Sequence, residues 1–441
     1  MIHGKGKNMS RITKRFASVA LAGLLTVSGM MAAPGMVTQA KTMPKVTMST
    51  TEQGAYKSYH AVPDKTFMYE DDGELHVVAV IGTRLTDYTI SRDLKVEDTE
   101  KVTLPRYEVW GGYFHSEKGQ HYVAIGYNNA EQSNSKAVIK VIKYNEDWKK
   151  TGMANIPGSV SNQYPGVSSP FASGNVSFDE YQNTLYMMTS RTTFKTSDGA
   201  SHQSNIAFAI DTRSMKAAAD NVSYCSHSFN QLVKFRDGSL YAVDHGDAYP
   251  RGVKVTIFDD YGKATTAGRR GSVTSFAFKG EIGNNSTGAT VGGLEISNNY
   301  ALVTGTAQPH GSSIGGVSGF ANGYGQNLYL IKRSRSTGDS TVKWLTAYNP
   351  TTSGVTVDCP RFVKVNDNRF AILYSVRNVR TGSRIFHCLY IDGEGNKVND
   401  VTFKDIQFRG GTQPIVFKNR IYFVEKPSNG AKTQIYDIPA K

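Results

Sequence analysis

Residues 227–252 read "HSFNQLVKFRDGSLYAVDHGDAYPRG", and the centre of this stretch has the pattern of a β-hairpin. Apolar residues and tyrosine alternate with polar residues in "LVKF" and again in "LYAV", and Arg-Asp-Gly separates the two runs. Alternation with a period of two predicts strands, and Asp-Gly between two such runs predicts a tight turn. Polar residues crowd both open ends of the predicted hairpin, at 227–231 and at 244–251.

The second strand of this hairpin recurs along the chain. Seven copies begin 46 to 70 residues apart, at residues 75–82, 121–127, 184–191, 239–246, 299–307, 369–376 and 420–426. Most copies follow another strand and a turn, and most precede a polar loop and a third strand. A sheet unit that repeats with such a period is typical of β-propeller blades.

We therefore expect an all-β chain in which residues 41–441 form a seven-bladed β-propeller. The segment 45–53 would supply the outer strand that the last repeat lacks, and so close the ring. Residues 213–221 are the one stretch that favours a short helix. A two-sheet sandwich is the rival architecture, but it explains the regular period less well.

The chain resembles secreted bacterial seven-bladed β-propellers with degenerate repeats. The resemblance covers residues 41–441 and implies the fold alone. The repeats lack the Trp-Asp ends of WD40 blades and the paired glycines of kelch blades. No family active site can therefore be transferred to particular residues.

The N-terminal 40 residues have the pattern of a secretory signal peptide. Five lysines and arginines precede an apolar run over residues 16–36, and the stretch ends in "VTQA", with small residues at the expected cleavage site after Ala40. No later run is long and apolar enough to span a membrane. We expect a secreted, extracellular protein without a transmembrane anchor.

The net charge of the chain indicates which classes of partner it can attract, and its cysteine count indicates whether disulfides form. Removal of the five N-terminal cations lowers the formal net charge from +13 to +8, which favours encounters with acidic polymers. The chain contains no Lys/Arg-rich run, so we do not expect a nucleic-acid partner. The three cysteines, Cys225, Cys359 and Cys388, are expected to be unpaired thiols, and we expect a monomer.

The predicted topology places several polar segments on one face. Because neighbouring strands of a blade are antiparallel, each innermost strand begins on the face at which the second strand ends. We call this side of the ring the start face. His227 and the 244–251 segment should therefore lie close together on it, and the long loop at 189–204 should lie on it too.

Three interpretations of this polar cluster are open. A histidine and an aspartate could tie two loops together, as a satisfied buried pair. Alternatively, the cluster could bind a ligand, with Arg251 as the partner of a carboxylate and Tyr249 as a flat face for a sugar ring. It could also be catalytic, through His227, His245 and Arg251. A metal site is a further possibility, with His227, His245, Asp247 and His310 as zinc ligands or Asp244 and Asp247 as calcium ligands.

The ligand interpretation gives a binding set on the start face. Its residues are His227, Asn230, Gln231, Asp244, His245, Asp247, Tyr249, Arg251, His310, Arg191 and Arg377. The predicted function is an extracellular binding module for a carbohydrate or an acidic cell-surface polymer. A polysaccharide lyase or glycoside hydrolase, and a protein–protein interaction scaffold, are the alternatives.

Overall fold

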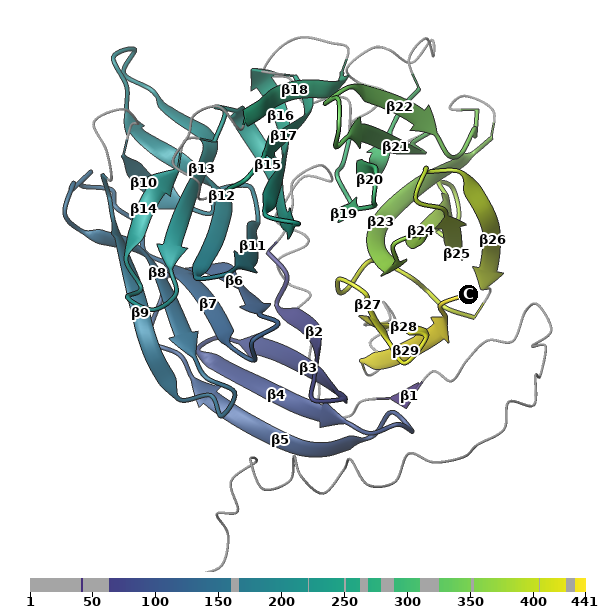
Figure 1. The fold of residues 1–441 in the computed structure, drawn as a ribbon, viewed down its shortest axis with the longest axis horizontal. Helices are drawn as coiled ribbons and strands as arrows, with labels where there is room; N and C mark the ends of the chain where they lie inside the picture. Colours follow the sequence, from purple (N-terminus) through teal and green to yellow (C-terminus); the bar gives the residue numbers. More distant parts are fainter. Residues whose placement is uncertain are drawn as a thin grey trace, which may run out of the picture. The chain divides into compact units, whose positions relative to one another are not determined.

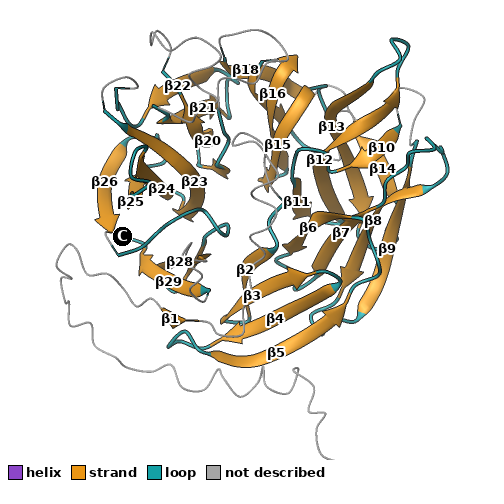
Figure 2. Cartoon of the chain, turned by 180° about the vertical axis from the view of Figure 1, so that it is seen from behind, coloured by secondary structure: helices purple, strands orange, loops and turns teal. Residues whose placement is uncertain are grey.

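The computed structural model describes residues 41–42, 63–159, 166–220, 222–249, 251–261, 269–278, 289–309, 325–349, 353–403, 405–425 and 433–441. All regular elements in these ranges are strands, as Figure 2 shows. The prediction of an all-β chain is confirmed. The prediction of a helix at 213–221 is wrong, because Ala217–Asp220 forms strand β14. No helix that could cross a membrane occurs in the described ranges.

Five four-stranded antiparallel sheets form separate blades. The first consists of β2 (Thr66–Asp71), β3 (Glu74–Ile81), β4 (Arg84–Ile90) and β5 (Val96–Thr103). The next consists of β6 (Val109–His115), β7 (His121–Gly126), β8 (Ala137–Tyr144) and β9 (Lys150–Pro157). Two further blades are β19 (Gly293–Ile296), β20 (Tyr300–Ala307), β21 (Asn327–Ser334) and β22 (Ser340–Trp344), and β23 (Val355–Asn366), β24 (Arg369–Asn378), β25 (Arg384–Ile391) and β26 (Lys397–Phe403). The last is β27 (Ile415–Phe417), β28 (Arg420–Glu425), β29 (Gln434–Pro439) and β1 (Lys41–Thr42).

The third and fourth predicted repeats share a single nine-stranded sheet. It contains β10 (Val167–Pro170), β11 (Val176–Tyr181), β12 (Thr184–Lys195), β13 (Ser201–Asp211), β14, β15 (Ser226–Arg236), β16 (Ser239–Tyr249), β17 (Gly252–Phe258) and β18 (Arg269–Ala277). One antiparallel pair, Ser204↔Ser226, joins the two repeats. Strand β14 is only four residues long and pairs with residues 207–210 of β13, so the start of β13 has room for β15.

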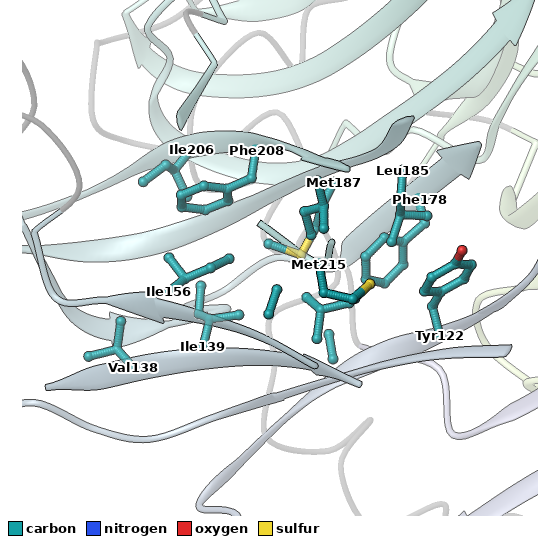
Figure 3. Packing of buried hydrophobic residues seen from close by; sticks show 14 of the residues in the cluster. Tyr122, Val138, Ile139, Ile156, Phe178, Leu185, Met187, Ile206, Phe208 and Met215 are labelled. Atoms are coloured by element: carbon teal, nitrogen blue, oxygen red, sulfur yellow. The ribbon is translucent and has the colours of Figure 1, made fainter. Parts of the chain in front are cut away.

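The structure therefore has five separate blades and not the predicted seven. The sheets nevertheless follow one another around a common centre, as Figure 1 shows. Buried hydrophobic clusters join each sheet to the next; the cluster in Figure 3, for example, packs Val138 and Ile139 against Phe178 and Phe208. A further cluster joins Leu75 and Val77 of the first sheet to Val424 and Ile435 of the last. The fold is a β-propeller.

An N-terminal strand completes the last sheet, as expected, but from different residues. Lys41 pairs with Ile435 and Thr42 with Gln434, in antiparallel register. The predicted closing segment, 45–53, lies outside the described residues. All three cysteines are free thiols, which confirms that prediction.

The inner edge of the nine-stranded sheet is sealed by side chains. Backbone N–H groups of Gln231, Val233 and Phe235 on β15 donate to side-chain oxygens of Asn175, Ser177 and Asp179, at 2.7, 2.9 and 2.5 Å. These three acceptors lie at alternate positions, Asn175 directly before β11 and the other two on it, which is the spacing of side chains on one face of a strand. They therefore satisfy backbone N–H groups on the inner edge of β15, where no further strand pairs with it.

Candidate functional site

The two polar ends of the central hairpin meet on the start face. Strands β15 and β16 pair Ser226 with Tyr249, Ser228 with Gly246 and Gln231 with Asp244. The register shifts on both sides of Ser228, and His227 has a left-handed backbone with φ of 49°. A non-glycine residue in that region is uncommon and marks a locally constrained backbone. The predicted proximity of His227 to residues 244–249 is therefore present.

Asp244 is the buried centre of this meeting point. Its Oδ1 accepts a hydrogen bond from the Ser228 hydroxyl at 2.6 Å, and Gln231 Nε2 donates to the same hydroxyl. Burial raises the pKa of Asp244 to about 7, because a carboxylate loses its hydration there. This arrangement agrees with the first interpretation, in which a buried hydrogen bond ties two loops together. The partner of the aspartate is Ser228, however, and not a histidine.

The other candidates at this end are also buried. Arg251 and Asp247 form an ion pair in which both side chains are almost fully covered. His245 is fully buried, with its ring edge-on to Phe229 and Phe278 at 5.9 and 5.6 Å. Within the described ranges, no group of three His, Cys, Asp or Glu side chains could hold a metal ion. Asp244 and Asp247 thus make no metal site with described neighbours.

The remaining predicted residues lie in different surroundings. Asn230 Nδ2 donates to the Val291 carbonyl at 2.7 Å and ties β15 to the segment before β19. Arg191 is buried on β12, where it lines a small pocket together with Asn205 and Asp220. Tyr249 is the last residue of β16. His310 lies outside the described residues.

The predicted loop at 189–204 is instead a β-hairpin. Strand β12 continues to Lys195 and β13 begins at Ser201, with the turn at 196–200 between them. His202 Nε2 lies 2.8 Å from Oδ2 of Asp198 in this turn, within hydrogen-bond distance. The prediction of a long loop is wrong because the Thr-rich strand pattern simply extends through it.

A cluster of arginines surrounds Asp358 on the start face of the β23–β26 sheet. Arg377 Nε donates to Asp358 Oδ2 at 3.0 Å, and Arg384 donates to Oδ1 at 2.5 Å. All three side chains are partly exposed, Asp358 to 23%. We call Asp358, Arg377 and Arg384 the Asp358 cluster. Of these three residues only Arg377 was predicted from the sequence, since the pairing depends on residues from three strands.

The Asp358 cluster has an excess of positive charge. Two guanidinium groups share one carboxylate, and no hydrogen bond within the described part of the chain uses the terminal nitrogens of Arg377. Arg380, in the turn between β24 and β25, is exposed. Such planar donors suit carboxylate, sulfate or phosphate groups of a ligand.

A buried carboxyl group on the last sheet lies close to Cys359, next in sequence to this cluster. Glu425 accepts hydrogen bonds from the backbone N–H groups of Arg409 and Gly411, both at 3.0 Å. Burial raises the pKa of Glu425 to about 7. The arginine whose charge acts on Glu425 is Arg361, outside the Asp358 cluster, and it lowers the pKa by less than burial raises it.

A second polar cluster lies between the β2–β5 and β6–β9 sheets and was missed by the sequence analysis. Asp87 accepts hydrogen bonds from Tyr69 (2.5 Å), Trp148 (2.9 Å) and His76 (3.3 Å). His121 stacks on Trp148 at 3.8 Å, and burial lowers its pKa to about 3. His76 and Asp87 each interrupt an apolar strand, which was the available signal.

Comparisons with known proteins return similar solved structures but no family. No family model matches the chain, and no curated protein matches it. Solved structures that are similar include the polysaccharide lyase Uly1, with 10% identity over 92% of this chain and 98% of that chain and a TM-score of 0.47. The Dos1 propeller has 10% identity over 80% and 70%, with a TM-score of 0.39. The endo-arabinase from Bacteroides thetaiotaomicron VPI-5482 has 14% identity over 74% and 92%, with a TM-score of 0.32.

Asp244 should make the stability of the fold depend on pH. Its pKa is raised in the folded protein, so its contribution is complete below about pH 4 and is lost as pH rises through about 7. We expect wild type to lose about 2–4 kcal/mol relative to Asp244→Asn between pH 4 and pH 8. Urea unfolding across this range measures the difference, and parallel curves for the two proteins would contradict it.

Proposed function

We propose that the chain is an exported extracellular binding protein that recognises an acidic polysaccharide or another acidic cell-surface polymer through its start face. The observation that carries the proposal is the Asp358 cluster, where Arg377 and Arg384 share one partly exposed carboxylate. The signal-peptide pattern of residues 1–40 supports export. The net positive charge supports attraction of an acidic polymer.

Two of the three catalytic candidates are inaccessible to a substrate, whereas His227 is partly exposed. His245 is fully buried, and Arg251 is buried in its ion pair with Asp247. A group that takes a proton from a substrate must come within hydrogen-bond reach of it. The Asp358 cluster, by contrast, is partly exposed: Arg377 keeps 26% and Asp358 23% of its side-chain surface, and Arg384 keeps 10%.

The decisive experiment compares a double variant of the Asp358 cluster with a single arginine variant at the other end of β24. Arg377 lies at the start-face end of β24 and Arg369 at the opposite end. We expect Arg377→Gln combined with Arg384→Gln to weaken binding to polygalacturonate about 30-fold or more, because each charged hydrogen bond contributes about 1.5–3 kcal/mol. Arg369→Gln, the control, should weaken it by less than about threefold.

Affinity is measured by isothermal titration calorimetry at two salt concentrations, and polymer length is followed in the same samples. Constant length is expected from a binding protein. Shortening of the polymer by wild type would replace the proposal with the lyase or hydrolase alternative. Equal binding by the double variant and wild type would place the polymer site elsewhere.

A further inference from the structure

Arg377 and Arg384 are direct neighbours across two antiparallel strands. Strands β24 and β25 pair them, which places their β-carbons about 4.5–5.5 Å apart. Both side chains lie on the sheet face that packs against the last sheet, since Leu373 and Phe386, at alternate positions of the same strands, belong to that hydrophobic cluster. Like charges directly opposite each other destabilise a sheet, so this pair requires an anion beside it.

A β-bulge places the carboxylate of Asp358 beside the two arginines. Asp358 pairs with Ser375 of β24, and the register shifts directly after Asp358, where Cys359 has a left-handed backbone with φ of 55°. Bulges of this kind redirect side chains and are frequent next to binding sites. The Asp358 carboxylate gives one oxygen to each guanidinium group, Oδ2 to Arg377 and Oδ1 to Arg384. A carboxylate of a ligand could bridge the two arginines in the same way.

The Asp358 side chain can leave this position at a low energetic cost. In the described part of the chain it accepts hydrogen bonds from these two arginines alone. It keeps 23% of its side-chain surface exposed, and partly exposed ion pairs contribute little to stability. Another carboxylate that reached both arginines would replace the lost hydrogen bonds, while water would solvate the displaced aspartate.

We propose that Asp358 occupies the place of the ligand's anionic group, and that a carboxylate of the acidic polymer binds by displacing it from Arg377 and Arg384. Asp358 is then a competitor within the chain. A polymer with a carboxylate on every sugar competes better than a single acid, because its neighbouring groups raise the local concentration. The inference rests on the proposed function and names polyuronates as the ligand class of the same site.

Isothermal titration calorimetry of the full chain with polygalacturonate at about 0.15 M salt tests the inference. We expect Asp358→Asn to bind about tenfold more tightly than wild type, because both arginines lose their internal partner. Asp358→Glu, which keeps the competing charge, should bind within about twofold of wild type. Asp405→Asn is the matched control, since Asp405 is an exposed carboxylate of the neighbouring segment, and it should change affinity by less than about threefold.

Two further variants show whether the gain comes from the arginines. Asp358→Ala should give the same gain as Asp358→Asn, and it excludes interference from the asparagine amide, which is itself a donor. In a chain that also carries Arg377→Gln and Arg384→Gln, Asp358→Asn should give no gain. An equal gain in that chain would overturn the inference, because it would show a general effect of charge. Affinities of Asp358→Asn and Asp358→Ala that do not exceed that of Asp405→Asn would overturn it too.

Inorganic sulfate gives a second readout, which separates this inference from the proposed function. We expect sulfate to raise the thermal midpoint of Asp358→Asn more than that of wild type, because the small anion can enter the vacated position. If no form of the protein binds polygalacturonate, the proposed function is wrong, and with it the polyuronate assignment; the sulfate comparison then decides the competitor role of Asp358 alone. If the two arginine substitutions weaken polymer binding but Asp358→Asn strengthens neither polymer nor sulfate binding, the proposed function stands and Asp358 is not a competitor.

Discussion

Replacement of Asp87 by alanine is expected to cost about 3–5 kcal/mol of folding free energy, the cost of leaving buried polar partners uncompensated. Asp87 is buried and accepts from Tyr69, His76 and Trp148, which come from three different strands or turns. Hydrogen bonds from these donors lower its pKa despite its burial. The substitution leaves three donors without an acceptor between the β2–β5 and β6–β9 sheets.

Urea unfolding at pH 7 measures this cost, and Asp98→Ala is the matched control. Asp98 is an exposed carboxylate on β5, the neighbouring strand, and its substitution changes the net charge equally. We expect Asp98→Ala to change stability by less than about 0.5 kcal/mol. The free energy of unfolding of Asp87→Asn should lie between those of Asp87→Ala and Asp98→Ala, because the asparagine amide keeps one acceptor oxygen. Equal stability of Asp87→Ala and Asp98→Ala would show that the cluster contributes nothing.

Gly305→Ala is the other substitution with a large expected effect. A β-carbon at this position of β20 would lie 1.9 Å from the Thr290 carbonyl oxygen and 2.3 Å from the Tyr329 hydroxyl. Tyr329 is fully buried and donates to that same carbonyl at 2.7 Å, so neither group can move without breaking the other contact. We expect a loss of roughly 3 kcal/mol, at the upper end for overpacking.

The control for this prediction is Gly112→Ala on β6. The β-carbon there would meet nothing closer than 3.4 Å, and we expect a loss of less than about 1 kcal/mol. Thermal unfolding midpoints of both variants give the comparison. A Gly305→Ala protein that melts together with Gly112→Ala would mean that β20 and its neighbours adjust their packing.

The sequence predicts the sheet units well and their grouping less well. Period-two alternation and Asp-Gly or Asn-containing turns depend on local backbone preferences, so strands such as β15 and β16 follow from the residues themselves. The pair Ser204↔Ser226, which joins two repeats into one sheet, forms where β14 does not cover β13, because β14 is only four residues long. Three alanines at 217–219 favour a helix locally, and pairing with β13 overrides that preference.

The sequence likewise predicts which segments of the candidate site meet, but not which of their side chains pair. Topology alone predicts that His227 lies close to residues 244–249, and this is observed. The pairing of individual side chains cannot be predicted in this way, because it depends on how deeply each side chain is buried and on its orientation. The Arg251–Asp247 ion pair and the shared carboxylate of Asp358 result from tertiary packing that no local pattern encodes.

The strand pair formed by residues 41–42 and 434–435 has a consequence for the order of assembly. Its two partners are separated by nearly the whole polypeptide, and a contact of such high sequence separation forms slowly. The blade made of β27–β29 and β1 cannot be complete before Gln434 and Ile435 have been synthesised. The ring of a growing chain therefore stays open until residues 434–435 have left the ribosome, and its closing hydrogen bonds cannot form before the preceding sheets have been synthesised.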